Sequence, residues 1–218
     1  KTMKYKTIVF DYDGTLHESI HIYYPAFIKV YEELVEKGLQ PKRDWKQDEV
    51  TKFLGMNPKE MWASFKPALS EEAIKIASAR VGEEMRARIL KGDAKLYKNS
   101  IEVLEKLKKE GHTLVYLSNS KTYYMEFHKK NFSLDKYFDY YMVSEQYDYI
   151  PKEDILKTVL DKLPKPVLVV GDRTHDMQAG IKNNLDTCGC LYGYGSVDEF
   201  KDATYMISDI KEVLEIVK

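Results

Sequence analysis

The chain has 218 residues, and 34 Lys plus Arg against 35 Asp plus Glu give a formal net charge of −1. This length fits one domain, or a core with a smaller inserted domain, and such a chain needs no metal or disulfide in order to fold. The balanced charge argues against a nucleic-acid partner or a basic membrane contact, because both require clustered positive charge. No apolar run is long enough for a signal peptide or a membrane span, so we expect a cytoplasmic protein.

Six short apolar runs, rich in β-branched and aromatic residues, have the length of β-strands. In chain order they are Thr7–Phe10, Thr113–Leu117, Tyr140–Val143, Val167–Val170, Thr187–Leu191 and, more weakly, Tyr205–Ile207. Helical apolar stripes lie between or after these runs, over Ile101–Leu107, Lys152–Leu163 and Ile210–Val217. This alternation predicts an α/β fold with a Rossmann-like, doubly wound parallel sheet that is covered by helices on both faces.

The interval between the first and second predicted strands is too long for an ordinary crossover. Its helical segments are Ile20–Lys37, Gln47–Phe53, Lys59–Phe65 and Ser70–Leu90. We therefore expect a second, smaller, all-helical domain over residues 16–92, inserted into an α/β core made of residues 1–15 and 93–218. Within this domain, a polar and aromatic segment contains Lys42, Arg43 and Trp45. We expect it to be a solvated loop with one packed Trp, and the alternative is a cluster that binds a second anionic group of a substrate.

Two carboxylates follow the first predicted strand directly, in Asp11-Tyr12-Asp13-Gly14-Thr15. Asp11 and Asp13, two residues apart on an extended segment, project to the same side. They stand at the carboxyl end of a parallel strand, where open α/β sheets bind ligands. Gly14 lets the chain turn away without a side chain in the site. Two solvated acids beside a turn are an equally good interpretation of this segment alone.

A second acidic pair, Asp172 and Asp176, follows the strand Val167–Val170. Asp172 together with Asp11 offers the oxygen ligands that Mg²⁺ prefers. We expect a helix to begin near Asp176, so a helix cap is the alternative for that residue.

Polar residues also follow the second predicted strand, and a lysine precedes the fourth. The hydroxyl of Ser118, the amide of Asn119 and nearby main-chain N–H groups suit an anion, although a helix cap by Ser118 or Ser120 is the simpler interpretation. Lys152 begins a predicted helix, a position that is usually exposed.

The order of these strand-end segments resembles the haloacid dehalogenase superfamily, specifically its phosphoglycolate phosphatase-like and β-phosphoglucomutase-like members with a helical cap after the first strand. The segments that carry the resemblance are Phe10-Asp11-Tyr12-Asp13-Gly14-Thr15-Leu16 for the first motif, Leu117-Ser118-Asn119 for the second, Gly171-Asp172 with Asp176 for the fourth, and the glycine turn Gly193-Tyr194-Gly195-Ser196. The match covers essentially the whole chain.

The resemblance implies a magnesium-dependent phosphatase that acts on a small phosphorylated metabolite. Asp11 would be the nucleophile and form an aspartyl-phosphate, and Asp13 would be the general acid and base. Mg²⁺ would be held by Asp11, the main-chain carbonyl of Asp13 and Asp172, with Asp176 completing or orienting the ligand shell. The implied phosphate-binding residues are Thr15, Ser118 and Asn119, and the implied catalytic cation is Lys152.

The third motif departs from the family's pattern. There Lys is followed by Pro, whereas here Pro151 precedes Lys152, and alignment on Ile155-Leu156 places Ile150 where the Lys usually stands. We still predict that the Lys152 ammonium lies within about 4 Å of Asp11 or Asp172, because a long side chain absorbs a shift of two residues. Otherwise Lys121 or Arg173 would supply the charge.

Two other functions remain open from the sequence. One is a β-phosphoglucomutase-like phosphosugar mutase, which would pass the phosphoryl group to a second sugar hydroxyl. The other is a catalytically idle phosphate-binding scaffold on the same fold. Dehalogenases of the superfamily lack the second acid of the first motif, so Asp13 favours phosphoryl transfer.

Two further groups of residues carry expectations. His17, His21, Tyr23 and Tyr24 are candidates for lining the entry to the site, with surface or hinge packing as the alternative for the histidines. Cys188 and Cys190 would face the same side of a strand as two small buried side chains.

Overall fold

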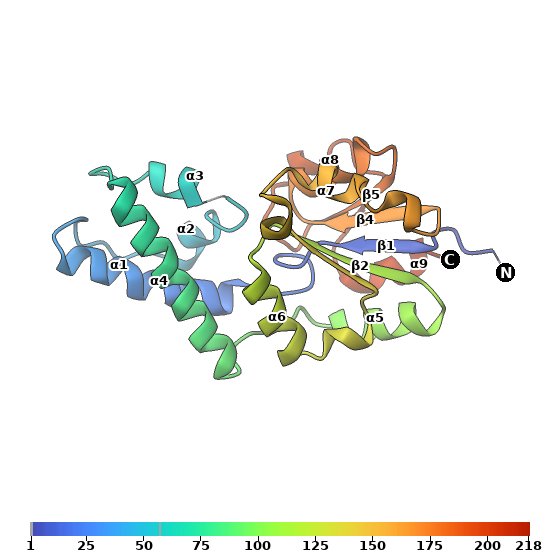
Figure 1. The fold of residues 1–218 in the computed structure, drawn as a ribbon, viewed down its shortest axis with the longest axis horizontal. Coiled ribbons are helices and arrows are strands. Elements are labelled where there is room, and N and C mark those ends of the chain that lie inside the picture. The colour runs from blue at the N-terminus through green and yellow to red at the C-terminus, as the bar shows by residue number, and fades with distance from the viewer. Residues whose placement is uncertain (1, 57) are drawn as a thin grey trace. The chain divides into compact units, whose positions relative to one another are not determined.

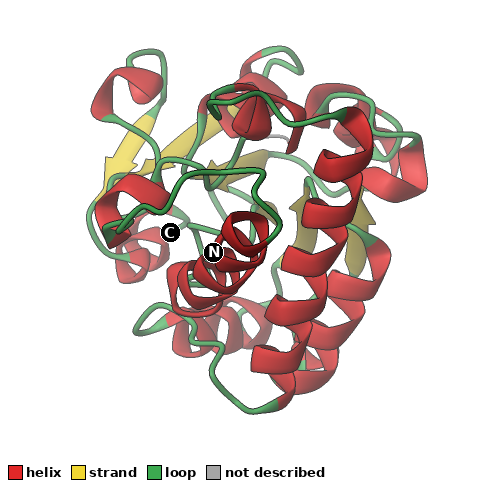
Figure 2. Cartoon of the chain, turned by 90° about the vertical axis from the view of Figure 1, so that its left-hand side faces the viewer, coloured by secondary structure: helices red, strands yellow, loops and turns green. Residues whose placement is uncertain are grey.

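The computed structural model describes residues 2–56 and 58–218. The chain divides into two compact units, one formed by the residues up to Glu18 together with Leu96–Lys218 and the other by Ser19–Lys95. The strands, drawn as arrows in Figure 1 and in yellow in Figure 2, belong to the first unit, which we call the core unit. The second unit, here the helical unit, is made of helices and loops in its described part.

The core unit is built on a six-stranded sheet of order β3-β2-β1-β4-β5-β6, in which each pair of neighbours is parallel. The strands are β1 (Thr7–Phe10), β2 (Thr113–Ser118), β3 (Tyr140–Val143), β4 (Val167–Gly171), β5 (Asp186–Cys190) and β6 (Tyr205–Ile207). The chain order reverses beside the central strand β1, which is the position where doubly wound sheets bind ligands. Asp11 is the next residue after β1 and therefore lies at this position.

The predicted doubly wound parallel sheet is confirmed, and the strand bounds differ from the prediction by one residue at most. Strand β2 continues through Ser118 and β4 through Gly171, because both residues still pair with the neighbouring strand. Cys188 and Cys190 are buried on β5, as predicted.

Helices cover both faces of the sheet, with α7 and α8 on one side and α5 and α9 on the other (Figure 1). The bounds in the core unit are α5 (Ser100–Lys109), α6 (Thr122–Asn131), α7 (Lys152–Lys157), α8 (Thr174–Ile181) and α9 (Val213–Ile216). Ile155 and Leu156 of α7 pack with Val9, Val115 and Val169 of the sheet. This packing fixes α7, and with it Lys152, under the carboxyl ends of the central strands.

The helix predicted over Lys152–Leu163 is shorter in the structure. Helix α7 ends at Lys157, and a separate 3₁₀ turn follows at Leu160–Lys162. Val159 and Leu163 are nevertheless buried in the same apolar cluster as α7. The apolar spacing therefore marked the buried face correctly, but it did not reveal the break in the helix.

The helical unit contains α1 (Ile20–Glu36), α2 (Gln47–Thr51), α3 (Pro58–Ala63) and α4 (Glu71–Leu90). Phe27 and Tyr31 of α1 pack edge-on against Trp45, and Phe65 stacks on the same indole ring. Trp45 is buried, and the Arg43 guanidinium lies 3.6 Å from the centre of its ring. The packed Trp in this loop is thus confirmed. None of the described helices combines the length and apolar composition needed to cross a membrane.

Candidate active site

Three buried carboxylates and one buried ammonium meet at the carboxyl ends of β1 and β4. Asp11 follows β1, Asp172 follows β4, and Asp176 lies in the first turn of α8. Each of these three residues offers a carboxylate oxygen, and the three oxygens lie within 4.8 Å of one another. We call these residues the acidic cluster. The parallel sheet brings them together because neighbouring strands end at the same edge.

Lys152 occupies the centre of this arrangement. Its Nζ donates to Asp11 Oδ1 at 2.7 Å and to Asp176 Oδ1 at 2.6 Å. The contact with Asp11 that the sequence predicts is present, and the second partner is Asp176, not Asp172. Pro151 is the N-cap of α7, so Lys152 is the first helical residue and only 2% exposed. The alternative cation Arg173 pairs instead with Glu199 at 3.0 Å.

Asp176 connects the loop after β4 to Lys152. Helix α8 begins at Thr174, which makes Asp176 the third residue of the helix and not its N-cap. Its Oδ2 accepts from the main-chain N–H groups of Asp172 and Arg173, both at 3.1 Å, while its Oδ1 accepts from Lys152. Burial alone would raise the pKa of Asp176, but the ammonium of Lys152 holds that pKa below its usual value. Asp176 therefore stays ionised and fixes both groups.

Asp172 is enclosed by two glycine turns. The main-chain N–H of Tyr194 donates to its Oδ2 at 2.8 Å. A Cβ on Gly193 would lie 2.3 Å from the Cβ of Asp172, and a Cβ on Gly14 would lie 2.0 Å from its Oδ2. Gly14 also has a φ of +83°, a conformation that costs little only for glycine. Both turns thus approach the carboxylate more closely than a residue with a side chain could.

With all three carboxylates ionised, the acidic cluster would hold more negative charge than Lys152 balances. Burial, and then the neighbouring Asp176, raise the pKa of Asp11 despite the opposing effect of Lys152. Burial and the carboxylates of Asp11 and Asp176 likewise raise the pKa of Asp172. A divalent cation would offset this repulsion. Mg²⁺ binds oxygen ligands at about 2.1 Å, a distance that suits three oxygens within 4.8 Å of one another. The residues present therefore fit Mg²⁺, with Asp11 and Asp172 best placed to hold it.

The other predicted phosphate-binding residues surround the cluster unequally. The Thr15 hydroxyl lies 3.3 Å from Asp11 Oδ2 and 3.4 Å from Asp172 Oδ1. Ser118 is buried at the end of β2, whereas Asn119 is exposed. The interpretation of Ser118 or Ser120 as a helix cap is wrong, since the N-cap of α6 is Lys121 and the Thr122 N–H donates to Glu145 Oε1 at 3.1 Å.

Asp13 points to a different set of partners. Its Oδ1 lies 2.7 Å from His17 Nδ1 and accepts a hydrogen bond of 2.7 Å from the Tyr124 hydroxyl. Burial and the charge of Asp13 raise the pKa of Tyr124 well above its ordinary value, so this hydroxyl stays protonated. His17 is fully buried, so its placement at the surface is excluded. Tyr124 was not among the residues predicted from the sequence, although α6 begins only a few residues after the second motif.

His128 lies one turn beyond Tyr124 on α6 and closes this part of the site from behind. Its ring centre lies 4.4 Å from those of His17 and Tyr124, and its Nδ1 lies 2.7 Å from the Tyr12 hydroxyl. Burial lowers the pKa of His128 to about 3, and the nearby His17 contributes to the shift. The imidazole of His128 is therefore neutral at physiological pH.

The other residues considered for the entry lie in the helical unit. His21 is exposed, Tyr23 is buried, and the Tyr24 hydroxyl donates to the main-chain oxygen of Trp45 at 2.8 Å. Their part in substrate entry stays a prediction.

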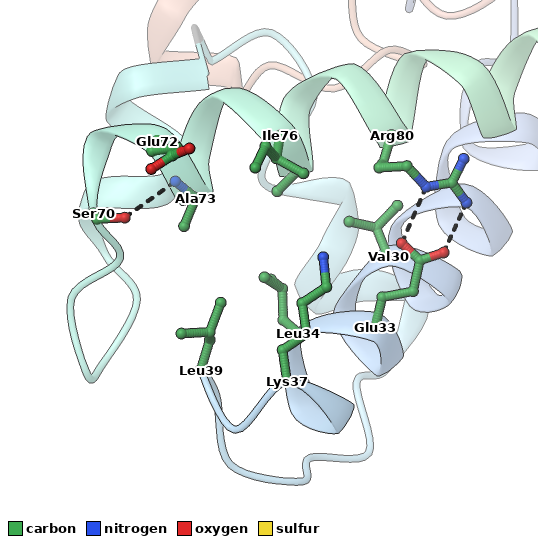
Figure 3. A pocket seen from close by; sticks show the side chains of 11 residues that line it. Val30, Glu33, Leu34, Lys37, Leu39, Ser70, Glu72, Ala73, Ile76 and Arg80 are labelled. Atoms are coloured by element: carbon green, nitrogen blue, oxygen red, sulfur yellow. Dashed lines mark hydrogen bonds and ion pairs between the residues drawn. The ribbon is translucent and has the colours of Figure 1, made fainter.

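A hollow of about 200 Å³ within the helical unit has a different character. It lies between α1 and α4, and Figure 3 shows Arg80 of α4 bridging to Glu33 of α1 at its rim. Val30, Leu34 and Ile76 supply much of its apolar wall. It lacks a converging set of buried reactive groups among its described lining residues, so we place the candidate active site at the acidic cluster.

Comparison with known proteins identifies the family of the chain. The sequence pattern of the haloacid dehalogenase-like hydrolases matches residues 8–190. The chain belongs to this family. It is accordingly a hydrolase, and the matched segment contains every residue of the acidic cluster together with Lys152, Asp13, His17 and Tyr124.

Similar proteins cover the chain nearly end to end. Pyrophosphatase PpaX of Bacillus mycoides is 22% identical over 222 residues, which span 99% of this chain and 98% of that protein. A haloacid dehalogenase-like hydrolase of Streptococcus pneumoniae has a similar solved structure, with a TM-score of 0.79, 24% identity and 97% of each chain covered. A predicted phosphoglycolate phosphatase of Haemophilus somnus gives a TM-score of 0.84, 21% identity and 99% of each chain covered.

Proposed function

We propose that the protein is a magnesium-dependent phosphatase that hydrolyses a small phosphate monoester through an aspartyl-phosphate intermediate. The observation that carries the proposal is the buried contact of Lys152 with Asp11 inside a cluster of three carboxylates. A structural role explains such a cluster poorly, because burying charges that are not fully balanced destabilises a fold. The names of the relatives, which include a pyrophosphatase and a phosphoglycolate phosphatase, agree with phosphate chemistry.

In the first step, a carboxylate oxygen of Asp11 forms a bond to phosphorus as the bond from phosphorus to the leaving oxygen breaks. The electron pair of that bond stays on the leaving oxygen, which takes a proton from Asp13. Lys152 orients Asp11 by a hydrogen bond of 2.7 Å and offers positive charge where the phosphoryl oxygens gather negative charge.

In the second step, Asp13 takes a proton from a water molecule as the water oxygen bonds to phosphorus. The bond between Asp11 and phosphorus breaks, which releases inorganic phosphate and returns Asp11 to its carboxylate form. Asp13 is suited to this exchange because it lies outside the acidic cluster and its side chain is 30% exposed.

Asp11, the main-chain carbonyl of Asp13 and Asp172 would hold Mg²⁺, and Asp176 would orient them. When bound, the cation offsets the repulsion between a carboxylate nucleophile and a phosphate dianion. We assign phosphate contacts to Thr15, Ser118 and Asn119. We also propose that residues 16–92 act as the cap that selects the substrate.

The direct test measures phosphate release by the purified protein from a panel of esters with and without Mg²⁺. The panel contains p-nitrophenyl phosphate, inorganic pyrophosphate, 2-phosphoglycolate and hexose phosphates. We expect release that stops when a chelator is added and returns with excess Mg²⁺.

Turnover that is insensitive to the chelator would contradict the role of the cation. Absence of phosphate release from the whole panel would favour the idle scaffold. Conversion of one hexose phosphate into its isomer without phosphate release would instead establish the mutase.

A further inference from the structure

We infer that His17 and Tyr124 are positioning residues for Asp13, which hold its Oδ1 and assign proton transfer to its Oδ2. The inference rests on the proposed function, in which Asp13 is the general acid and base. It concerns residues that the strand-end motifs do not include, since His17 lies beyond the first motif and Tyr124 lies in α6.

Two donors converge on one oxygen of Asp13. His17 Nδ1 and the Tyr124 hydroxyl each lie 2.7 Å from Oδ1. An ionised carboxylate only accepts hydrogen bonds, so Nδ1 of His17 carries the hydrogen in this contact. The Tyr124 hydroxyl also lies 3.4 Å from His17 Nδ1, so the three polar groups form one compact triangle.

Both donors are held rigidly. The main-chain N–H groups of Leu16 and His17 donate to the carbonyl of Tyr12, and Gly14 N–H donates to the carbonyl of His17. Tyr12 stacks on the His17 ring at a centre-to-centre distance of 5.2 Å. His128 packs 4.4 Å from the rings of both donors. A tight turn and a buried aromatic wall therefore fix the directions from which Asp13 is approached.

Solvation of Asp13 does not explain this arrangement. The Asp13 side chain is 30% exposed, so water could hydrate it. The two residues that donate to its Oδ1 are nevertheless buried, since His17 is fully buried and Tyr124 is only 8% exposed. Ordering two buried polar side chains costs conformational freedom and desolvation. What the pair adds beyond hydration is direction, because both hydrogen bonds end on the same oxygen.

Direction is what a general acid requires. An oxygen that accepts two hydrogen bonds cannot present its own proton to a leaving group, so the proton lies on Oδ2. Proton transfer depends steeply on the placement of the donor, and fixing Oδ1 fixes Oδ2 through the planar carboxyl group. His17 and Tyr124 thus act through Asp13 without touching the substrate.

The test compares two substrates that need the acid to different degrees. The leaving group of an alkyl phosphate is a basic alkoxide that needs a proton. The leaving group of p-nitrophenyl phosphate is p-nitrophenolate, which departs readily without one. We expect His17→Leu and Tyr124→Phe each to lower kcat/KM for the alkyl phosphate by about tenfold or more, the size of one hydrogen bond to a charged group. The loss for p-nitrophenyl phosphate should be several times smaller. His17→Asn keeps an N–H donor at the δ position and should recover most of the loss.

The Asp13→Asn background separates positioning from general damage. If His17 and Tyr124 act through Asp13, Tyr124→Phe should cost p-nitrophenyl phosphate hydrolysis nothing further once Asp13 is replaced. Tyr137→Phe, which removes a hydroxyl bonded to Glu105 at 3.1 Å, and His112→Leu, a buried histidine before β2, are matched controls that should keep wild-type kinetics.

Equal losses for both substrates, or a further loss in the Asp13→Asn background, would overturn the inference. If His17→Leu does not fold, Tyr124→Phe decides alone, because it removes a single oxygen atom. A wild-type protein without magnesium-dependent phosphate release would instead overturn the proposed function, so the two failures are distinguishable.

Discussion

Each unit contains a cation that pairs with more than one carboxylate, and the two groups of residues differ in burial. In the core unit Lys152 meets Asp11 and Asp176 with 1% of its side chain exposed. In the helical unit Arg80 pairs with Glu33, Glu83 and Glu84, and 30% of its side chain is exposed. Exposed ion pairs cost little to form and contribute little, whereas buried ones carry a desolvation penalty that often exceeds their attraction.

The carboxylates of the two clusters respond to this difference. Hydrogen bonds from Arg80 and Arg88 lower the pKa values of Glu33 and Glu84, so these two acids are stabilised in their charged forms. Among the three acids of the acidic cluster, the pKa is lowered for Asp176 and raised for Asp11 and Asp172. The charged forms of Glu33 and Glu84 are therefore favoured beside Arg80, whereas the charged forms of Asp11 and Asp172 are disfavoured and would be favoured by a further cation.

The largest expected effect on turnover is that of Asp11→Asn in the acidic cluster. The change keeps the shape of the side chain and removes both the proposed nucleophile and one of the three crowded carboxylates. We expect turnover to fall by about a thousandfold or more, as for other nucleophile replacements. The midpoint of thermal unfolding should stay the same or rise. Phosphate release and calorimetry check the two parts.

The matched control is Asp202→Asn, an exposed carboxylate of the core unit. It should leave both turnover and the unfolding midpoint unchanged. Wild-type turnover in Asp11→Asn would remove Asp11 from the nucleophile position.

Lys152→Ala should lower turnover by about a hundredfold or more, because one preorganised charge at the reacting phosphate is lost. It also leaves Asp11 and Asp176 buried without their ammonium partner, which should cost about 3–5 kcal/mol of unfolding free energy. Lys157→Ala on the same helix, where the side chain is exposed, serves as the control. A near-normal rate for Lys152→Ala would show that another cation serves the phosphate.

Asp172→Ala tests the excess negative charge directly. We expect the affinity for Mg²⁺ to fall by about tenfold or more in titration calorimetry, since a ligand oxygen held by two glycine turns is lost. The stabilisation of the wild-type fold by added Mg²⁺ should shrink in parallel. Unchanged affinity would exclude Asp172 as a ligand.

The sequence predicts the sheet and its strand-end acids because both follow from local patterns. Continuous apolar runs are typical of strands buried on both faces, and residues at the ends of parallel strands share one edge. The contact of Lys152 with Asp11 was expected from the resemblance to the family's third motif, with a long side chain to absorb the inverted order of Pro and Lys.

Other features depend on long-range packing that no local pattern reveals. Tyr124 reaches Asp13 only because α6 packs with that face toward the turn after β1. Spacing alone places Tyr124 and His128 on one face of a helix but does not say what that face meets. The interpretation of Asp176 as an N-cap failed for a smaller reason: α8 begins two residues earlier than expected, at Thr174.

Acid should weaken the core unit through His128. Its pKa of about 3 in the folded protein lies below the ordinary value of 6.5, so the unfolded chain binds more protons between these values. Stability therefore falls as the pH drops through this range, by about 2 kcal/mol between pH 7 and pH 5 for this group. Urea unfolding at pH 7 and at pH 5 measures the unfolding free energy of wild type and of His128→Gln. Between these two pH values, wild type should lose about 2 kcal/mol more than the variant. An unchanged difference would mean that His128 is not held neutral.

The smallest effect is expected at Arg80, the centre of the partly exposed cluster in the helical unit. Arg80→Met keeps most of the apolar stem that packs at the rim of the hollow in Figure 3 and removes the guanidinium that bonds to Glu33 at 2.7 Å and 3.1 Å. We expect a loss of about 1 kcal/mol or less in urea unfolding, because exposed pairs are individually weak. The loss should shrink further in 1 M salt, where charges separated by more than about 3 Å are screened. Turnover on p-nitrophenyl phosphate should be unchanged, since Arg80 is not one of the residues of the candidate active site. A loss above about 3 kcal/mol, in the range of a broken buried pair, would show that exposure is not what separates the two clusters.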